Sequence, residues 1–124
     1  MENKKELIQK IGKFIKDTKH VARDTFLAYA FLRNVPYIKL ERVINEDKQC
    51  FGELGRNAFL DYLSYHVSSV IVSLQFGCNN AYFLEREGKK DEAIALREFE
   101  ASIRKQIFAW MMEKYKTDSQ EKAA

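Results

Sequence analysis

Apolar and small residues recur at alternating steps of three and four along the first quarter of the chain. Between Asn3 and Arg33 they fall on one side of a helix, which is the pattern of an amphipathic helix that buries a stripe. The spacing predicts one long helix over 3–33, with Asn3 as its N-cap. The members of the stripe are Leu7, Ile11, Phe14, Thr18, Val21, Thr25, Ala28 and Leu32.

Further helical segments follow, separated by residues that interrupt helices. Val35-Pro36 ends the first helix, because proline disfavours helical backbone at the residue before it, and Pro36 suits the first turn of the next helix. The later helices are expected over 36–47, 56–76, 81–87 and 90–115. The pattern therefore predicts an all-α fold, a compact bundle of four to five helices with a long first helix and a charge-poor central helix.

A chain of 124 residues fits a single domain with its own core. We expect the helical domain to cover 1–116. Residues 117–124 are polar and are predicted to form a frayed C-terminal tail.

The distribution of charge is uneven. Residues 1–33 carry eight basic and four acidic side chains, whereas 58–84 contain only Asp61, although the net charge of the chain is just +3. The excess positive charge therefore belongs to the predicted first helix, where Glu6, Asp17 and Asp24 lie on the flank opposite to a basic stripe. The members of the basic stripe are Lys5, Lys16, Lys19 and Arg23.

The predicted last helix carries two apolar faces. The main face contains Leu96, Phe99, Ile103, Ile107 and Trp110. One face suffices for docking on a core, so the second predicts that the helix is sandwiched, either inside the bundle or at a homodimer interface. This candidate interaction face consists of Ile94, Ala101, Phe108, Met112 and Tyr115.

The most enzyme-like group of residues is a polar seam on the predicted central helix, made of Tyr62, His66, Ser69 and Ser73. A histidine near hydroxyl groups and a carboxylate can perform acid–base or nucleophilic chemistry. Side chains on one helix face do not converge on a substrate by themselves, however, so we expect a hydrogen-bonded seam rather than a catalytic centre.

No cofactor or metal is expected. The histidines and cysteines (His20, Cys50, His66 and Cys78) offer no short-range ligand pair of the kind that zinc sites use. The segment 52–55 lacks the lysine and the third glycine of a phosphate-binding loop.

Two cysteines without CxxC spacing indicate reduced thiols and a cytoplasmic location, with one structural disulfide as the alternative. The run 62–84 has no charged residue, but its serines, asparagines and histidine favour a buried helix over a membrane span.

These features favour a non-enzymatic interaction or regulatory protein that acts through helical surfaces, as a homodimer. The alternative is a small nucleic-acid-binding regulator that uses the basic stripe on phosphates. Residues 26–44 loosely resemble a helix-turn-helix, although the helix that would follow offers little beyond Arg56 to a nucleic acid. An enzyme centred on His66 is the third hypothesis.

Overall fold

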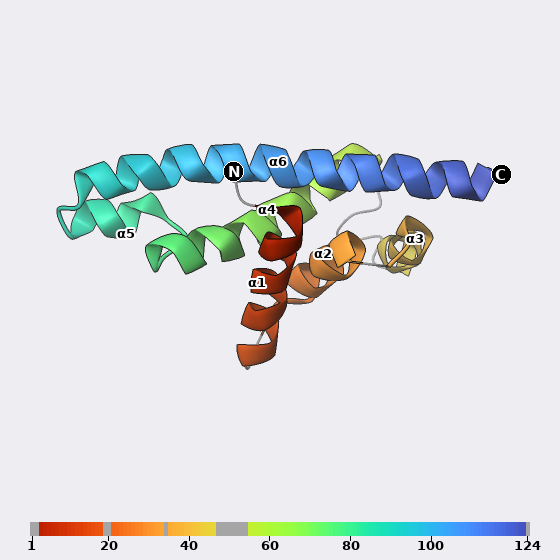
Figure 1. Cartoon of the computed structure of the whole chain (residues 1–124), viewed down its shortest axis with the longest axis horizontal. Coiled ribbons are helices and arrows are strands. Elements are labelled where there is room, and N and C mark those ends of the chain that lie inside the picture. Colours follow the sequence, from red (N-terminus) through yellow and green to blue (C-terminus); the bar gives the residue numbers. More distant parts are fainter. Residues whose placement is uncertain (1–2, 19–20, 34, 47–54, 124) are drawn as a thin grey trace.

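The computed structural model describes residues 3–18, 21–33, 35–46 and 55–123. Its helices confirm the predicted all-α bundle. They are α1 (Lys4–Asp17), α2 (Arg23–Arg33), α3 (Tyr37–Glu46), α4 (Gly55–Phe76), α5 (Ala81–Arg86) and α6 (Lys90–Ala123). Figure 1 shows α6 running along the molecule with α4 and α5 beside it, while α1 extends away from α6 at a steep angle.

The charge-poor helix α4 lies at the centre of the bundle, as predicted. It packs against α6 along much of its length, and it also contacts α2 and α1. The buried residues of α4 cover more than half of the helix circumference, which explains why this helix can lack charge. They are Phe59, Leu60, Leu63, Ser64, Val67, Ser68, Val70, Ile71 and Val72.

Leu74 departs from this pattern. The sequence places it on the apolar face of the central helix, three residues after the buried Ile71, yet its side chain is 49% exposed. It lies in the last turn of α4 and lines a hollow between α4 and α1. Among the described residues, no helix combines the length and the apolar character that a membrane crossing requires.

The predicted long first helix is wrong, because the chain forms two helices there. Helix α1 ends at Asp17, Thr18 is extended with φ −98° and ψ 126°, and α2 begins at Arg23. The spacing by three and four nevertheless identified most of the buried positions of both pieces, although it left out Phe31. Leu7 and Ile11 of α1 are buried, as are three stripe members of α2: Thr25, Ala28 and Leu32.

The break allows α2 to fold back along α1. A Cβ atom added to Gly12 would lie 2.6 Å from the Tyr29 hydroxyl, so the two helices approach each other closely at a residue without a side chain. In one continuous helix these residues would be roughly 25 Å apart. A straight helix would also carry half of the apolar stripe past α4, so the tertiary packing favours the hairpin over the local helical pattern.

The last two helices follow the predicted turns. Helix α4 ends at Phe76, and the next residue, Gly77, has a φ of +77° that suits glycine. The Asn80 side chain caps α5 by accepting a hydrogen bond from the Tyr82 amide at 3.0 Å. Helix α6 continues to Ala123, past the end predicted at 115. Asp118, in the predicted polar tail, accepts a hydrogen bond from the Tyr37 amide at 3.1 Å and so joins the end of α6 to α3.

Candidate functional site

The predicted interaction face on α6 is divided into two parts. Its C-terminal part, formed by Phe108, Met112 and Tyr115, is half-buried and packs against the hydrophobic core of the same chain. Its N-terminal part, Ile94 and Ala101, is exposed, and 53% of the Ile94 side chain is accessible. Packing inside the bundle, the first of the two predicted explanations, therefore accounts for three of the five residues.

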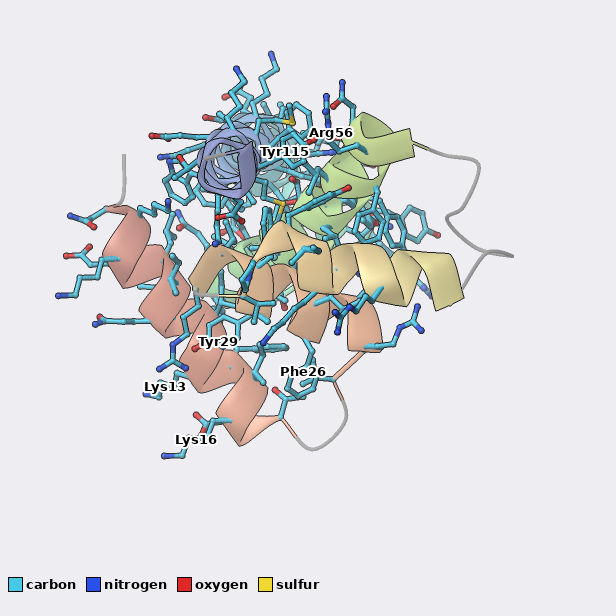
Figure 2. The ribbon with its side chains drawn as sticks, turned by 90° about the vertical axis from the view of Figure 1, so that its right-hand side faces the viewer. Lys13, Lys16, Phe26, Tyr29, Arg56 and Tyr115 are labelled. Atoms are coloured by element: carbon cyan, nitrogen blue, oxygen red, sulfur yellow. The ribbon has the colours of Figure 1, made fainter. Side chains whose placement is uncertain are left out.

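Tyr115 is the centre of a group of contacts that we call the aromatic junction. Its ring meets Tyr37 edge-on, with centroids 4.7 Å apart, and Tyr37 in turn meets the buried Phe31 at 5.9 Å. The guanidinium of Arg56 lies 4.4 Å from the Tyr115 ring centroid and donates a hydrogen bond of 3.0 Å to its hydroxyl. Figure 2 shows Arg56 and Tyr115 together beside the end of α6.

A second cation completes the aromatic junction. The Lys114 ammonium lies 5.2 Å from the Phe31 ring centroid and 3.5 Å from a carboxylate oxygen of Asp118. Both Lys114 and Asp118 are about four-fifths buried, with 19% and 18% of their side chains exposed. The junction thus joins α2, α3, α4 and α6, and each of its charged groups has a partner in the chain.

The polar seam of α4 forms structural contacts. The Tyr62 hydroxyl donates a hydrogen bond of 2.7 Å to Asp24 on α2, and its ring meets His66 edge-on at 4.5 Å. Ser69 accepts a hydrogen bond of 3.1 Å from the side chain of Asn79, which follows α4. Ser73, the last member, is half-buried. The seam therefore holds α2 and the turn after α4 in place, and its hydroxyl groups do not converge on one point.

The basic stripe is distributed over two helices by the break after Asp17. Lys5 and Lys16 are exposed on α1, and Arg23 is exposed at the start of α2, where its Nε lies 3.6 Å from Asp24. Lys19 lies outside the described residues. The cations of α1 are more numerous than the stripe suggested, because the helix carries five lysines and two carboxylates.

Helices α1 and α4 enclose a hollow of about 630 Å³, which we call the lysine groove. Its apolar part combines Phe14 from α1 with Ile71 and Leu74 from α4, and its polar part includes two lysines of α1. The groove is lined by Lys10, Lys13, Phe14, Asp17, Thr18, Ile71, Leu74 and Gln75. Its volume falls within the range of binding sites, of order 300–1,000 Å³.

The charge of the lysine groove comes entirely from α1, since α4 has no charged residue after Asp61. Within the described part of the chain, neither Lys13 nor Lys16 forms an ion pair. Figure 2 shows both lysines pointing away from the bundle, at the opposite side from Arg56 and Tyr115. The groove therefore presents an apolar floor beside Lys13, which no described carboxylate pairs with.

A second hollow, of about 420 Å³, lies between α4 and α6, and its cation Arg104, unlike Lys13, has partners inside the chain. There Arg104 donates a hydrogen bond of 2.7 Å to Asp61, and its guanidinium lies 5.4 Å from the Tyr65 ring centroid. Its principal cation is thus satisfied inside the chain. The lysine groove is the better candidate for a binding site.

The sequence interpretation missed the lysine groove for two reasons. It treated Leu74 as part of the core, and it treated the flank of α1 that contains Glu6 and Asp17 as acidic. Lys10 and Lys13 lie on that same flank, at the i+4 and i−4 positions from those carboxylates. The signal in the sequence was Phe14 beside a flank of α1 that mixes lysines with carboxylates. Nothing in the local sequence indicated that α4 would lie against this part of α1.

No group of three or more potential ligands in the described part of the chain is placed to hold a metal ion. Cys78 is a free, half-buried thiol there, whereas His20 and Cys50 lie outside the described residues.

No protein-family model matches the chain, and no curated protein and no solved structure shows significant similarity to it.

Proposed function

We propose that this protein is a non-enzymatic interaction or regulatory protein that binds a protein partner through its helical surface, at the lysine groove. The observation that carries the proposal is the 49% exposure of Leu74 beside Lys13. An apolar side chain in a concave site bordered by cations is the usual composition of a helix-binding groove, in which apolar anchors supply affinity and charges fix orientation.

The non-enzymatic part of the proposal is supported by the polar seam. The groups that would perform acid–base chemistry there are engaged in structural contacts, with Tyr62 bonded to Asp24 and Ser69 to Asn79. A nucleophile, a base and an orienting group directed at a common point would be expected of an active site. We place the protein in the cytoplasm as part of the same proposal, on its low cysteine content.

Site-specific photo-crosslinking in the native host tests this proposal. A benzoylphenylalanine residue replaces Leu74 in one strain and Ile38 in another, since Ile38 is also an exposed apolar residue, at 43%, but lies on α3. We expect a discrete protein adduct from position 74 and none from position 38. Equal crosslinking from both positions, or none from position 74, would contradict binding at the lysine groove.

Self-association as a homodimer is the second part of the proposal. It is supported by exposed apolar side chains on α5 and on the first turns of α6: Tyr82 at 56%, Phe83 at 49% and Ile94 at 53%. Such side chains on one end of a bundle suit contact with a second copy. Sedimentation equilibrium should detect a dimer that the substitution Ile94→Lys weakens, and a monomer at all concentrations would remove this part.

The alternative function, nucleic-acid binding, is favoured by one observation, the five lysines of the 14-residue helix α1. A complex driven by phosphate contacts would weaken steeply with salt. Filter binding of a short DNA duplex over a salt series distinguishes the two functions. Removal of the charges of Lys5 and Lys16 together would abolish such a complex, and an unchanged affinity in that variant would eliminate the alternative.

A further inference from the structure

We infer that the lysine groove receives an acidic amphipathic helix of the partner protein, with carboxylates of that helix at Lys10 and Lys13 and its apolar residues over Phe14 and Leu74. This inference rests on the proposed function and adds the chemistry and the orientation of the partner segment. Four features of the groove support it: its shape, its sign of charge, its apolar floor and the position of Asp17.

The shape of the groove fits a helix. The residues that α1 contributes, from Lys10 to Thr18, extend over roughly 12 Å along the helix axis. This length corresponds to about two helical turns of a ligand, which present apolar anchors at positions i, i+3 or i+4, and i+7. On the α4 side, Ile71 and Leu74 follow one another at i and i+3, so the floor has matching spacing. A membrane surface, being flat, would not enter a concave site of this kind.

The charge of the groove specifies an acidic ligand. The lining of the groove contains Lys10 and Lys13 against one carboxylate, Asp17, and the α4 side contributes no charge, only the amide of Gln75. Lys13 is exposed and forms no ion pair with the described carboxylates. A carboxylate of the ligand would lie near its ammonium group with little loss of solvation, which favours an acidic partner over a basic one.

The apolar floor also favours a peptide over a nucleic acid. Phosphate contacts need donors along a backbone track, and the α4 side of the groove supplies Leu74 and Ile71 where such donors would be required. Burial of Leu74 under an apolar anchor removes from water a side chain that the folded chain leaves half exposed.

Asp17 gives the complex a direction. It lies in the groove at the last residue of α1, where the exposed carbonyl groups of the helix end add further negative potential. Carboxylates of the ligand are therefore expected toward Lys10 and Lys13, away from Thr18. Neutral or basic residues of the ligand are expected beside Asp17.

A set of synthetic peptides tests the inference with the full-length protein. Each peptide has about 18 residues, enough for a helix longer than the groove. The first carries leucines at helical spacing and glutamates on the flanks. The second replaces the glutamates with lysines, and the third keeps the glutamates but replaces the leucines with serines. Fluorescence anisotropy should show the first binding at least about tenfold more tightly than either of the others.

Matched variants locate the site. Leu74→Ser and Lys13→Glu should each weaken the first peptide about tenfold, as expected for residues at the centre of an interface. Two controls make the same changes on α3, where Ile38→Ser and Lys39→Glu alter exposed residues outside the groove. These controls should change the affinity less than about twofold. The variant Asp17→Asn should bind the first peptide about twofold to threefold more tightly, because it removes a like charge.

The inference is overturned if the lysine-bearing peptide binds as well as the glutamate-bearing one, or if groove and control variants behave alike. It is also overturned if a short DNA duplex binds more tightly than the first peptide and is the ligand that Lys13→Glu weakens. A protein adduct at position 74 whose crosslinked segment is not acidic would refute the inference while leaving the proposed function standing. Absence of any adduct specific to position 74 would refute the proposed function itself.

Discussion

The aromatic junction and the lysine groove are built from the same materials, and they differ in what their cations contact. At the junction, Arg56 lies on Tyr115, and Lys114 lies between Phe31 and Asp118. In the groove, Lys13 borders Phe14 and Leu74, but no described carboxylate pairs with it. Figure 2 shows the labelled residues of the two regions well separated on the molecule.

The difference indicates what each region is for. A cation that is mostly buried, as Lys114 is, must be paired, because an unpaired buried charge is costly, so its contacts at the junction contribute to the stability of the bundle. An exposed cation beside an exposed apolar side chain carries no such requirement. Substitutions in the junction should therefore lower stability, whereas substitutions in the groove should leave stability unchanged and alter binding.

The largest expected effect is at Phe31, which is completely buried in the junction. Phe31→Ala should lower the free energy of unfolding by about 3–5 kcal/mol, because it leaves a cavity against Tyr37 and Lys114. Urea denaturation followed by far-UV circular dichroism measures this change. Phe26, on the same helix, is 48% exposed, so Phe26→Ala should cost less than about 0.5 kcal/mol. Similar losses in the two variants would remove the distinction between the junction and the surface of α2.

A smaller loss is expected at Asp118. Asp118→Ala removes the acceptor for the Tyr37 amide at the start of α3 and the partner of Lys114, which should cost about 1–2 kcal/mol. The matched control is Glu113→Ala on the exposed face of α6. If both variants unfold at the wild-type urea concentration, the end of α6 does not stabilise the junction.

Arg56 should contribute less, because its contacts with Tyr115 are partly in solvent. Arg56→Ala should lower the free energy of unfolding by about 0.5–1 kcal/mol, the usual magnitude of a cation–π contact at an exposed site. A double-mutant cycle with Tyr115→Leu isolates the interaction between the two side chains. A coupling energy of zero would show that the junction is stable without this cation.

The smallest expected effect is in the lysine groove. Leu74→Ser and Lys13→Glu should each change the free energy of unfolding by less than about 0.5 kcal/mol, since both side chains are exposed. Thermal and urea denaturation of the isolated protein measure this directly. A loss comparable to that of Asp118→Ala would mean that the groove is a structural contact, and the comparison with the junction would fail.

Much of the fold could be predicted from local patterns. The apolar spacing identified most of the buried positions of α4 and three on α6, although it placed Leu74 in the core and left out Met111. Pro36 and Gly77 marked real helix boundaries. The division of the first helix could not be predicted, because Asp17-Thr18 contains no proline or glycine. The division goes together with the approach of Tyr29 to Gly12, a contact between helices that no local pattern contains.

The candidate site was less predictable than the fold. The sequence identified the excess of positive charge near the N-terminus, and α1 accounts for five of these lysines. It also assigned Phe108, Met112 and Tyr115 to one apolar face, but periodicity alone left open whether α6 or a second copy would cover them. The structure packs these three residues against the core of the same chain.

By itself, then, the sequence determined that this is a helical protein with a charge-poor central helix and a basic N-terminal region, since hydrophobic periodicity and charge are local properties. The tertiary structure alone decided that α2 folds back on α1, that Tyr115 is used inside the bundle, and that Leu74 stays exposed beside Lys13. Whether an apolar side chain is buried depends on which other helices pack against it. That packing joins residues far apart in the sequence, so local patterns do not determine it.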